Sequence, residues 1–591
     1  MIMKNKIKRS VSIVCSALLI SIGMLNPTTV NAAAEINKTE TLTGTEFTGE
    51  VASSFKSIFN NNPISSKMFC ADPTAVEYNG RLYVFGTSDH QQYLESSPDK
   101  DNTYEKIKSL AILSTDDMVN WVYHGEINVG EIAPWIMNSW APSITSRVED
   151  DGLTHFYLYF SNNGTGVGVI TATDPLGPWS DPLGEPLINY NTPGLTDCPN
   201  PFDPGVVIDD DGIGWLSFGG GKAKDGTDFM PGTSRIVRLG EDMLSFDSDF
   251  MEIPAPYFFE ASELNFINGT YVYTYCSDWN SHYVNWNYDA EVPSACSMVY
   301  MTTKTPLDPE SWVMKGECFK NPGLSGFDNS NNHTHMHKFN GEWYMFYQSL
   351  FLRRSMGIQG GYRSICAEKI NVDEETVTIE KSQASEYGYP PQNSKIPYVV
   401  TLGADINSEA DTFFDTSDMS APLVISANPG AWTSVRNVMF TQPEGDDIEK
   451  IGFKKNLSFI AEVRGSGRVE VRVDSPDGAV LTSIDFDSAD EFSVIYSKSV
   501  KGVGGFHDLY FVFSDKDIAV RNWQFCTADG FNNEFPLNNS DLDISKAVKA
   551  DGGFWDSVLS FAAKYGVWVI CAVVVCAAGA VLLIKLKKSK K

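Results

Sequence analysis

The stretch VEYNGRLYVFGTSD (residues 76–89) decides the fold, because it recurs four more times along the chain in related form. Each copy alternates aromatic and β-branched residues around a turn glycine, which is typical of a β-hairpin. The other copies are EDDGLTHFYLYFS (149–161), IDDDGIGWLSFGG (208–220), NFINGTYVYTYCSD (265–278) and KFNGEWYMFYQS (338–349). A sheet-forming unit that returns every roughly 60–70 residues predicts a five-bladed β-propeller.

A polar residue precedes each hairpin at a nearly constant distance. Counting back eight or nine residues from the turn glycines gives Asp72, Ser143, Asp203, Glu260 and His333. Equivalent positions of the blades face one another around the axis of a propeller. We therefore expect these five side chains at one mouth of the propeller, where converging acids suit general acid–base chemistry.

The composition excludes some classes of partner. The 591 residues carry a formal net charge of −30, and nucleic-acid binding would need basic patches. The cysteines are irregularly spaced and odd in number outside the two ends of the chain, which favours buried free thiols over a disulfide framework. We expect a monomer.

Both ends of the chain indicate export. Residues 1–32 combine a basic start, an apolar stretch and small residues at the cleavage position, which predicts a signal peptide. Residues 564–584 are predicted to form a transmembrane helix, because the apolar run 566–584 is long enough to span a bilayer and the lysines of 585–591 follow it. The positive-inside rule then predicts a single-pass protein at the cell membrane, with its N-terminal ectodomain on the extracellular face and a basic cytoplasmic tail.

The segments between these ends predict an all-β protein. Residues 33–55 are expected to be a flexible leader and residues 56–385 the propeller. The breaker-rich residues 386–404 indicate a linker. Short alternating strands in residues 405–526 predict a jelly-roll-like β-sandwich, and the polar residues 527–563 a stalk before the transmembrane helix.

The propeller region resembles glycoside hydrolase family 43, five-bladed enzymes that act on arabinoxylan and related hemicelluloses. The motifs that carry the resemblance are MFCADPTAVEYNGRLYVFGTSD (68–89), NSWAPSI (138–144), GVGVITATDPLGPWSD (166–181), FDPGVVIDDDG (202–212), YFFEASELNFINGTYVYTY (257–275), NNHTHMHKFNGEWYMFY (331–347) and GGYRSI (360–365). They occur in this order and are similar to the arabinoxylan arabinofuranohydrolases and the β-xylosidases near them.

The resemblance implies three catalytic roles. Asp72 matches the general base, Glu260 the general acid, and Asp203 the carboxylate that tunes the acid. Inverting hydrolysis needs an acid and a base about 6.5–9.5 Å apart, with room for a water molecule. Asp203 beside Glu260 would raise the pKa of Glu260 by repulsion between like charges. Glu263 is a rival for the acid role, but residues three apart in a regular strand point to opposite faces, so we expect Glu260 to face the axis.

His333 has two interpretations. Its place in the family's Asn-Asn-His motif implies a hydrated Ca²⁺ in the central channel, with a structural role. The alternation of His333, His335 and His337 would also place all three on one face of a strand, as in zinc hydrolases.

Two further residues match the family's substrate pocket. Trp140 corresponds to a residue of the pocket wall, or it packs between blades. Arg363 corresponds to an arginine that approaches the sugar and would keep Asp203 ionised, or it forms a salt bridge between blades.

The sandwich region resembles a family 6 carbohydrate-binding module through SEADTF (408–413), GAWTSVRN (430–437), RVEVRVDSPDG (468–478), HDLYFVFSD (507–515) and NWQF (522–525). Trp432 matches the position that stacks on sugar in that family. Ala519 and Arg521 replace an Asn and an Asp that contact sugar and calcium. A spacer that braces the propeller is therefore an alternative to a sugar-binding module.

Together these features predict an inverting glycoside hydrolase, either an α-L-arabinofuranosidase or a β-xylosidase. It would act on the side chains or ends of arabinoxylan or xylo-oligosaccharides during hemicellulose degradation. A non-catalytic cell-surface glycan-binding protein with an inactive propeller is the alternative.

Overall fold

The computed structural model describes residues 46–527, apart from residues 98, 281, 283–284, 441–455, 498–499 and 502. The predicted signal peptide, stalk, membrane span (564–584) and basic tail lie outside the described residues. Among the residues that are described, no helix is both long and apolar enough to cross a bilayer.

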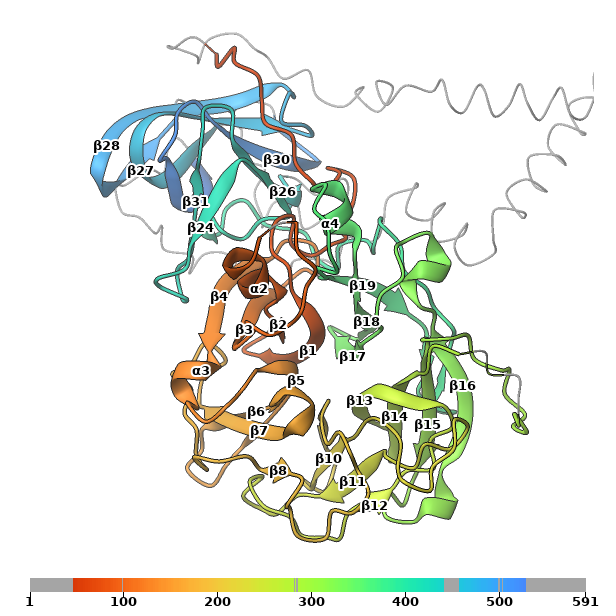
Figure 1. Ribbon diagram of the computed structural model, residues 1–591. Coiled ribbons are helices and arrows are strands. Elements are labelled where there is room, and N and C mark those ends of the chain that lie inside the picture. The colour runs from red at the N-terminus through yellow and green to blue at the C-terminus, as the bar shows by residue number, and fades with distance from the viewer. Residues whose placement is uncertain are drawn as a thin grey trace, which may run out of the picture.

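Five antiparallel sheets surround a central axis, as Figure 1 shows. The first blade contains β1 (Ala71–Tyr78), β2 (Arg81–Thr87), β3 (Ser109–Thr115) and β4 (Val122–Asn128). The second contains β5 (Trp140–Val148), β6 (Thr154–Ser161), β7 (Gly166–Ala172) and β8 (Ile188–Asn189). The third contains β9 (Gly205–Ile208), β10 (Gly214–Phe218), β11 (Arg235–Arg238) and β12 (Met251–Glu252). The fourth contains β13 (Phe258–Ile267), β14 (Thr270–Ser277), β15 (Met298–Thr303) and β16 (Val313–Phe319). The fifth contains β17 (Thr334–Phe339), β18 (Glu342–Ser349) and β19 (Ser364–Ile370).

The first strand of each blade is the innermost one. β1 lies beside β5, β5 beside β9, β9 beside β13, β13 beside β17, and β17 beside β1, so the five sheets form a closed ring. Each predicted hairpin forms the first two strands of a blade, which confirms the five-bladed propeller. Apolar clusters fill the spaces between neighbouring sheets, for example Leu158 and Phe160 of the second blade with Ile112 of the first.

A segment just before the first blade pairs with the last blade. Residues 61–64 lie along β19, where Ile64 N donates to Ile365 O (3.0 Å) and Asn62 Nδ2 to Ala367 O (2.9 Å). The N-terminal segment therefore fastens the last blade to the first.

Helices are short and few in the described residues. They are α2 (Asp89–Glu95), α3 (Val129–Ile132) and α4 (Phe351–Ser355), with 3₁₀ turns at Asn163–Thr165, Pro309–Ser311 and Pro322–Ser325. A small hairpin, β20 (Val372–Asp373) and β21 (Thr378–Ile379), follows the fifth blade.

The second unit is one strongly curved sheet that encloses its own core. Its strands are β22 (Thr401–Leu402), β23 (Ser408–Ala410), β24 (Thr412–Asp415), β25 (Leu423–Ser426), β26 (Trp432–Met439), β27 (Asn456–Val473), β28 (Val480–Tyr496), β29 (Val500–Lys501), β30 (Phe506–Phe513) and β31 (Ala519–Thr527). The first half of β27 pairs with β31 and the second half with β30. Gly465 and Gly467 lie at the bend with φ of 113° and 140°, a backbone region that only glycine adopts easily. The sheet thus folds into a sandwich-like unit, as expected.

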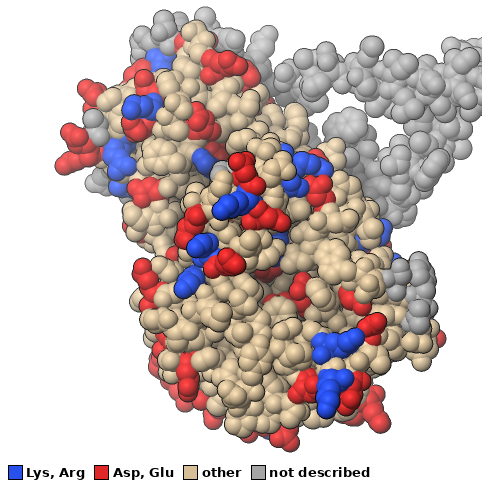
Figure 2. Space-filling model, viewed as in Figure 1, with Lys and Arg blue, Asp and Glu red and all other residues tan. Residues whose placement is uncertain are grey.

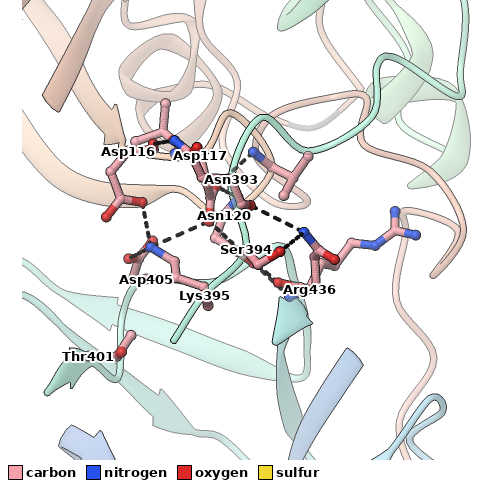
Figure 3. Close-up of polar contacts among 12 residues, drawn as sticks. Asp116, Asp117, Asn120, Asn393, Ser394, Lys395, Thr401, Asp405 and Arg436 are labelled. Carbon is pink, nitrogen blue, oxygen red and sulfur yellow. Dashed lines mark hydrogen bonds and ion pairs between the residues drawn. The ribbon is translucent and has the colours of Figure 1, made fainter. Parts of the chain in front are cut away.

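The propeller and the sandwich share a polar interface. Trp121 N donates to Ile406 O (2.8 Å), and Asn407 Nδ2 donates to Val119 O (2.7 Å). Figure 3 shows Lys395 among the acids of this interface. Its ammonium lies 2.5 Å from Asp116, 2.6 Å from Asp405 and 3.4 Å from Asp117.

The N-terminal segment corrects two expectations. Residues 46–55 belong to the predicted flexible leader, yet they pack on the sandwich, where Ala52 N donates to Gly430 O (2.9 Å). Trp432 lies beneath this segment with 1% of its surface exposed, and its Nε1 donates to Ala52 O (2.7 Å). The prediction that Trp432 stacks on sugar is wrong for this structure, because the leader covers the indole ring.

Candidate active site

The chain is kinked at the mouth-side start of the innermost strand in four of the blades. Asp72, Ala141, Asp203 and Ala261 have φ of 50°, 40°, 51° and 61°. Such left-handed residues are uncommon outside glycine and cost roughly 1–3 kcal/mol each. Their repetition at one level of the propeller shows that the kink belongs to the architecture of the mouth.

Each kink is fastened to the preceding blade through its backbone N–H. The Asp72 N–H donates to Gln348 Oε1 (2.8 Å), Ala141 to Thr87 Oγ1 (2.8 Å), Asp203 to Ser161 Oγ (2.8 Å) and Ala261 to Asp203 Oδ2 (2.9 Å). These bonds replace the strand pairing that each kink interrupts. They hold Asp72 and Asp203 in fixed positions at the mouth.

The kinks correct the alignment obtained by counting back from the turn glycines. Ala141 and Ala261 are the equivalents of Asp72 and Asp203, whereas Ser143 lies two residues deeper in β5. Ser143 is buried there and accepts a hydrogen bond from Val206 N (3.0 Å). Counting failed because the turns between the first two strands differ in length among the blades.

The kink at Ala261 also allows both candidate acids to face the axis. The pairing of β13 with β14 shifts register between Glu260 and Glu263, so the two side chains no longer alternate. Glu263 is buried, and its Oε1 lies 3.0 Å from Nδ1 of His335 on the innermost strand β17. Glu260 is half-buried at the mouth. The expectation that only one of them faces the axis is therefore wrong.

The Asp72 carboxylate is held through both oxygens. Arg363 Nη1 donates to Oδ1 (2.8 Å), and Thr87 Oγ1 donates to Oδ2 (2.6 Å). Asp72 is 5% exposed and its Oδ1 lies 3.6 Å from His333 Nδ1. These contacts fix the orientation of the Asp72 carboxyl group, which a general base needs.

Glu260 and Asp203 share an environment that disfavours a second negative charge. Burial, followed by the charge of Asp72, raises the pKa of Glu260 to about 7. Burial, followed by the charges of Glu260 and Asp72, raises the pKa of Asp203 well above its usual range. The raised pKa of Glu260 was expected from the sequence to come from Asp203, but burial is the main cause and the charge of Asp72 the second.

Both carboxyls accept hydrogen bonds. Asp203 accepts bonds from Ala261 N (2.9 Å) and from the Ser161 hydroxyl (3.3 Å). These donors favour its ionised form. Glu260 also accepts a hydrogen bond, from Asn331, and burial raises the pKa of both carboxyls, so the two groups titrate as a coupled pair.

Arg363 lies beside the base rather than beside Asp203. It binds Asp72 and Asp89, which belong to the first blade, so it is also a salt bridge between blades. The expectation that Arg363 keeps Asp203 ionised is not met. The Arg363 guanidinium carbon lies 4.9 Å from the centre of the Tyr104 ring.

Trp140 continues this stack of side chains. Its ring meets the Tyr104 ring edge-on at 6.1 Å, and its Nε1 donates to Tyr104 O (3.2 Å). Trp140 is half-buried at the start of β5. Its position suits both sequence interpretations, because it joins two blades and remains partly accessible at the mouth.

The three histidines lie along the channel but do not converge on one point. His335 Nε2 lies 3.3 Å from His337 Nδ1, and no cluster of three or more His, Cys, Asp or Glu side chains in the described part of the chain could hold a metal ion. The three-histidine zinc site is therefore contradicted.

His333 has features that bear on the expected calcium ion. Burial lowers the pKa of His333 to about 4, so its ring is neutral near pH 7 and can offer a lone pair. The side chains on either side of His333 in the sequence, Asn332 and Thr334, each have a buried oxygen without a hydrogen-bond partner among the described residues. Calcium prefers such oxygen atoms, with water completing its six to eight ligands.

Several residues of the site were not found from the sequence. Thr87 and Ser161 end the second strand of their blades, and Ser277 and Ser349 occupy the same place in two others. This repeated hydroxyl was a readable signal. Asp89 and Gln348 had no comparable pattern, because their partners are 274 and 276 residues away in the chain.

The mouth thus brings together the fixed carboxyl group of Asp72, the carboxyl group of Glu260 with its raised pKa, and the carboxyl group of Asp203. This set can protonate a departing oxygen and activate water in one step. Comparison with known proteins agrees with this chemistry, because residues 60–377 match the family "Glycosyl hydrolases family 43". The chain belongs to glycoside hydrolase family 43. It is therefore an enzyme of the arabinofuranosidase and xylosidase type, and the alternative of a non-catalytic binding protein is not supported.

Its similarity to characterised members extends beyond the propeller. The chain is 34% identical to the arabinoxylan arabinofuranohydrolase of Bacillus subtilis, over 78% of this chain and 90% of that protein. It is 31% identical to the enzyme of the same description from Paenibacillus polymyxa, over 80% and 75%. A crystal structure of a Bacillus subtilis arabinoxylan arabinofuranohydrolase in complex with cellotetraose superposes with a TM-score of 0.71 at 32% identity, covering 80% of this chain and 99% of that one.

Proposed function

We propose that this family 43 enzyme removes α-L-arabinofuranosyl side chains from arabinoxylan with inversion of configuration. The observation that carries the proposal is the held carboxylate of Asp72 opposite a Glu260 whose pKa is raised to about 7. Similarity to two arabinoxylan arabinofuranohydrolases over more than three quarters of the chain supports the substrate class.

In the proposed mechanism, Glu260 donates its proton to the glycosidic oxygen while Asp72 takes a proton from the attacking water. Arg363 and Thr87 keep the Asp72 lone pairs oriented. Asp203 accepts a hydrogen bond from Ala261, next to Glu260, and a negative charge on Asp203 would help to hold the proton on Glu260. Trp140 and Tyr104 form one wall for the sugar.

The proposal includes a calcium ion at His333. The ring of His333 would hold the ion on one side and water would complete its shell. Its positive charge would favour the ionised form of nearby carboxylates.

We also propose that the enzyme works on the extracellular face of the membrane. The support is the sequence alone, namely the basic and apolar residues 1–32 and the apolar run 564–584 with its lysine tail. Protease treatment of intact cells, followed by detection of the propeller, tests this placement. Loss of the propeller is expected, and full protection would contradict the proposal.

A product assay tests the reaction. Wheat arabinoxylan should yield arabinose, and xylobiose should yield little xylose; the reverse result would make the enzyme a β-xylosidase. NMR of the fresh product should show inverted anomeric configuration, whereas retention would exclude the mechanism.

Variants test the residue roles. Asp72→Asn and Glu260→Gln should each lower kcat by about 10²–10⁴-fold, the usual value of one positioned proton-transfer group. Glu263→Gln tests the rival for the acid role, since it alters a buried carboxyl group on the same strand. A severe loss with Glu263→Gln and a mild loss with Glu260→Gln would reverse the acid assignment.

A further inference from the structure

Asp89 is a buried carboxylate of the mouth that none of the roles above uses. It is the first residue of α2, directly after the second strand of the first blade, and it is 0% exposed. Its two oxygens accept three bonds from Arg363, namely from Nε (2.9 Å), Nη2 (2.8 Å) and the backbone N–H (2.9 Å). Such a bidentate pair fixes a guanidinium in position and in plane.

The two bonds from Nε and Nη2 to Asp89 also fix the direction of the third guanidinium nitrogen of Arg363, Nη1. Nη1 donates to Asp72 Oδ1 (2.8 Å). Because a guanidinium is planar and rigid, its Nη1 cannot turn away once Nε and Nη2 are bound. The Tyr104 ring at 4.9 Å from the guanidinium carbon restricts movement out of that plane.

We propose that Asp89 is a positioning residue for the general base: it fixes Arg363 and, through Arg363, the orientation of the Asp72 carboxylate. The inference rests on the role of Asp72 in the proposed function. Asp89 does not reach the substrate, and it also neutralises Arg363 so that the arginine orients Asp72 without becoming an unpaired buried charge.

The variant Asp89→Asn tests this role. Asparagine keeps the size of the side chain, but it has one acceptor oxygen, and its amide donors face the donors of Arg363. We expect kcat to fall by about 10–100-fold, with KM changed by less than about threefold, because the base loses orientation while the sugar contacts remain.

The leaving group distinguishes a defect of the base from a defect of the acid. p-Nitrophenolate departs with little protonation, so a damaged acid is masked with p-nitrophenyl α-L-arabinofuranoside and visible with an arabinoxylo-oligosaccharide. Asp89→Asn should slow both substrates by the same factor. Glu260→Gln, the reference for the acid, should spare the nitrophenyl substrate. Unchanged kcat in a folded Asp89→Asn, or a loss confined to the oligosaccharide, would overturn the proposal.

A matched control separates positioning from fold stability. Asp117 is another buried carboxylate of the first blade, paired with Lys395 at 3.4 Å in the interface with the sandwich. Asp117→Asn should lower the Tm but leave kcat within about twofold of the wild type. If Asp117→Asn loses as much kcat as Asp89→Asn at equal Tm, Asp89 has only a structural role.

Two further arms complete the test. If Asp89→Asn does not fold, Arg363→Lys replaces it, since a lysine keeps the charge but cannot bind both carboxylates in one plane. The same loss on both substrates is expected, and a loss on the oligosaccharide alone would contradict the proposal.

If the wild type releases no arabinose, the proposed substrate is wrong. The comparison then moves to p-nitrophenyl β-D-xylopyranoside and xylobiose, where the ratio of the two losses in kcat still decides the role of Asp89.

Discussion

At the scale of single residues, one proton on Glu260 sets the conditions under which the site works. The carboxyl is half-buried at the mouth, and burial together with the charge of Asp72 raises its pKa to about 7. Asn331 opposes this shift, because its amide hydrogen bond lowers the pKa of Glu260. Gln348 Nε2 in turn donates to Asn331 Oδ1 (3.0 Å), which leaves the Asn331 amide nitrogen for Glu260.

This proton predicts the alkaline side of the pH profile. Glu260 is protonated below its pKa and active as an acid, so kcat should fall as the pH rises through about 7. Asn331→Ala removes a bond that favours the ionised form, so this limb should move to higher pH. Measuring kcat between pH 5 and 9 for both proteins checks the prediction. A limb that stays in place, or moves to lower pH, would contradict the role of Glu260.

The sequence identified the three carboxylates of the site, but it did not identify the residues that hold them in position. Asp72 and Asp203 stand beside prolines in a repeated pattern, and Glu260 follows an aromatic pair. Arg363 was found as a site residue, yet its partner Asp89 was not, since the pair joins the first blade to the fifth. Contacts across a ring depend on which blades become neighbours, and local sequence does not encode that.

At the scale of elements, the kinked start of the inner strand explains where sequence rules failed. Side chains alternate in a regular strand, and this rule assigned Glu260 and Glu263 to opposite faces. The left-handed Ala261 inserts an extra residue, so both carboxyls face the axis at different depths. A kink of this kind needs no glycine and leaves no mark in the hydrophobic pattern.

The N-terminal segment that packs on the sandwich is a second element for which the prediction from the sequence was wrong. Polar composition predicted a flexible leader, but Phe47, Val51, Ala52 and Ile58 pack with Trp432 and Tyr510. Phe47 N donates to Glu470 Oε1 (2.6 Å), and Arg472 Nη2 donates to Phe47 O (3.2 Å). A few apolar residues at suitable spacing were enough to dock the segment.

Trp432 should therefore act in stability rather than in sugar binding. Trp432→Ala should lower the free energy of unfolding by about 3–5 kcal/mol, the usual cost of removing a buried aromatic side chain. Urea unfolding measures this change, and titration with xylohexaose should show no loss of binding. As a control, Tyr496→Ala alters an exposed aromatic of the same unit, 58% exposed, and should cost far less. Loss of micromolar xylan binding with Trp432→Ala would restore the sugar-stacking interpretation.

At the scale of the whole molecule, the propeller and the sandwich are joined by buried charge. Figure 3 shows how Lys395, from the predicted linker, reaches acids on both units. Asp116 and Asp117 belong to the propeller and Asp405 to the sandwich. The surrounding acids raise the pKa of Lys395, so its ammonium stays charged although it is buried.

On the described part of the face drawn in Figure 2, acidic and basic side chains are interspersed, which agrees with the exclusion of nucleic acid.

Removing the buried ammonium of Lys395 should lower the free energy of unfolding more than removing an exposed ammonium. Lys395→Met leaves Asp117 and Asp405 buried without their partner, so unfolding should become easier by about 3–5 kcal/mol. Lys369→Met is the control, because Lys369 pairs with Glu342 at 2.8 Å with both side chains over 40% exposed, and such pairs are worth about 0–1 kcal/mol. Calorimetry measures both. Equal losses would show that the interface charges are screened by solvent.

The fastening of residues 61–64 to the last blade has a consequence during synthesis. Asn62 and Ala367 meet across 305 residues of chain, which a ribosome produces in roughly 15–60 s at its usual rate of about 5–20 residues per second. Until then residues 61–64 have no partner strand, and without them β19 would keep an open sheet edge. The fifth blade therefore gains the pairing along its outer strand from a segment that was made before all the other blades.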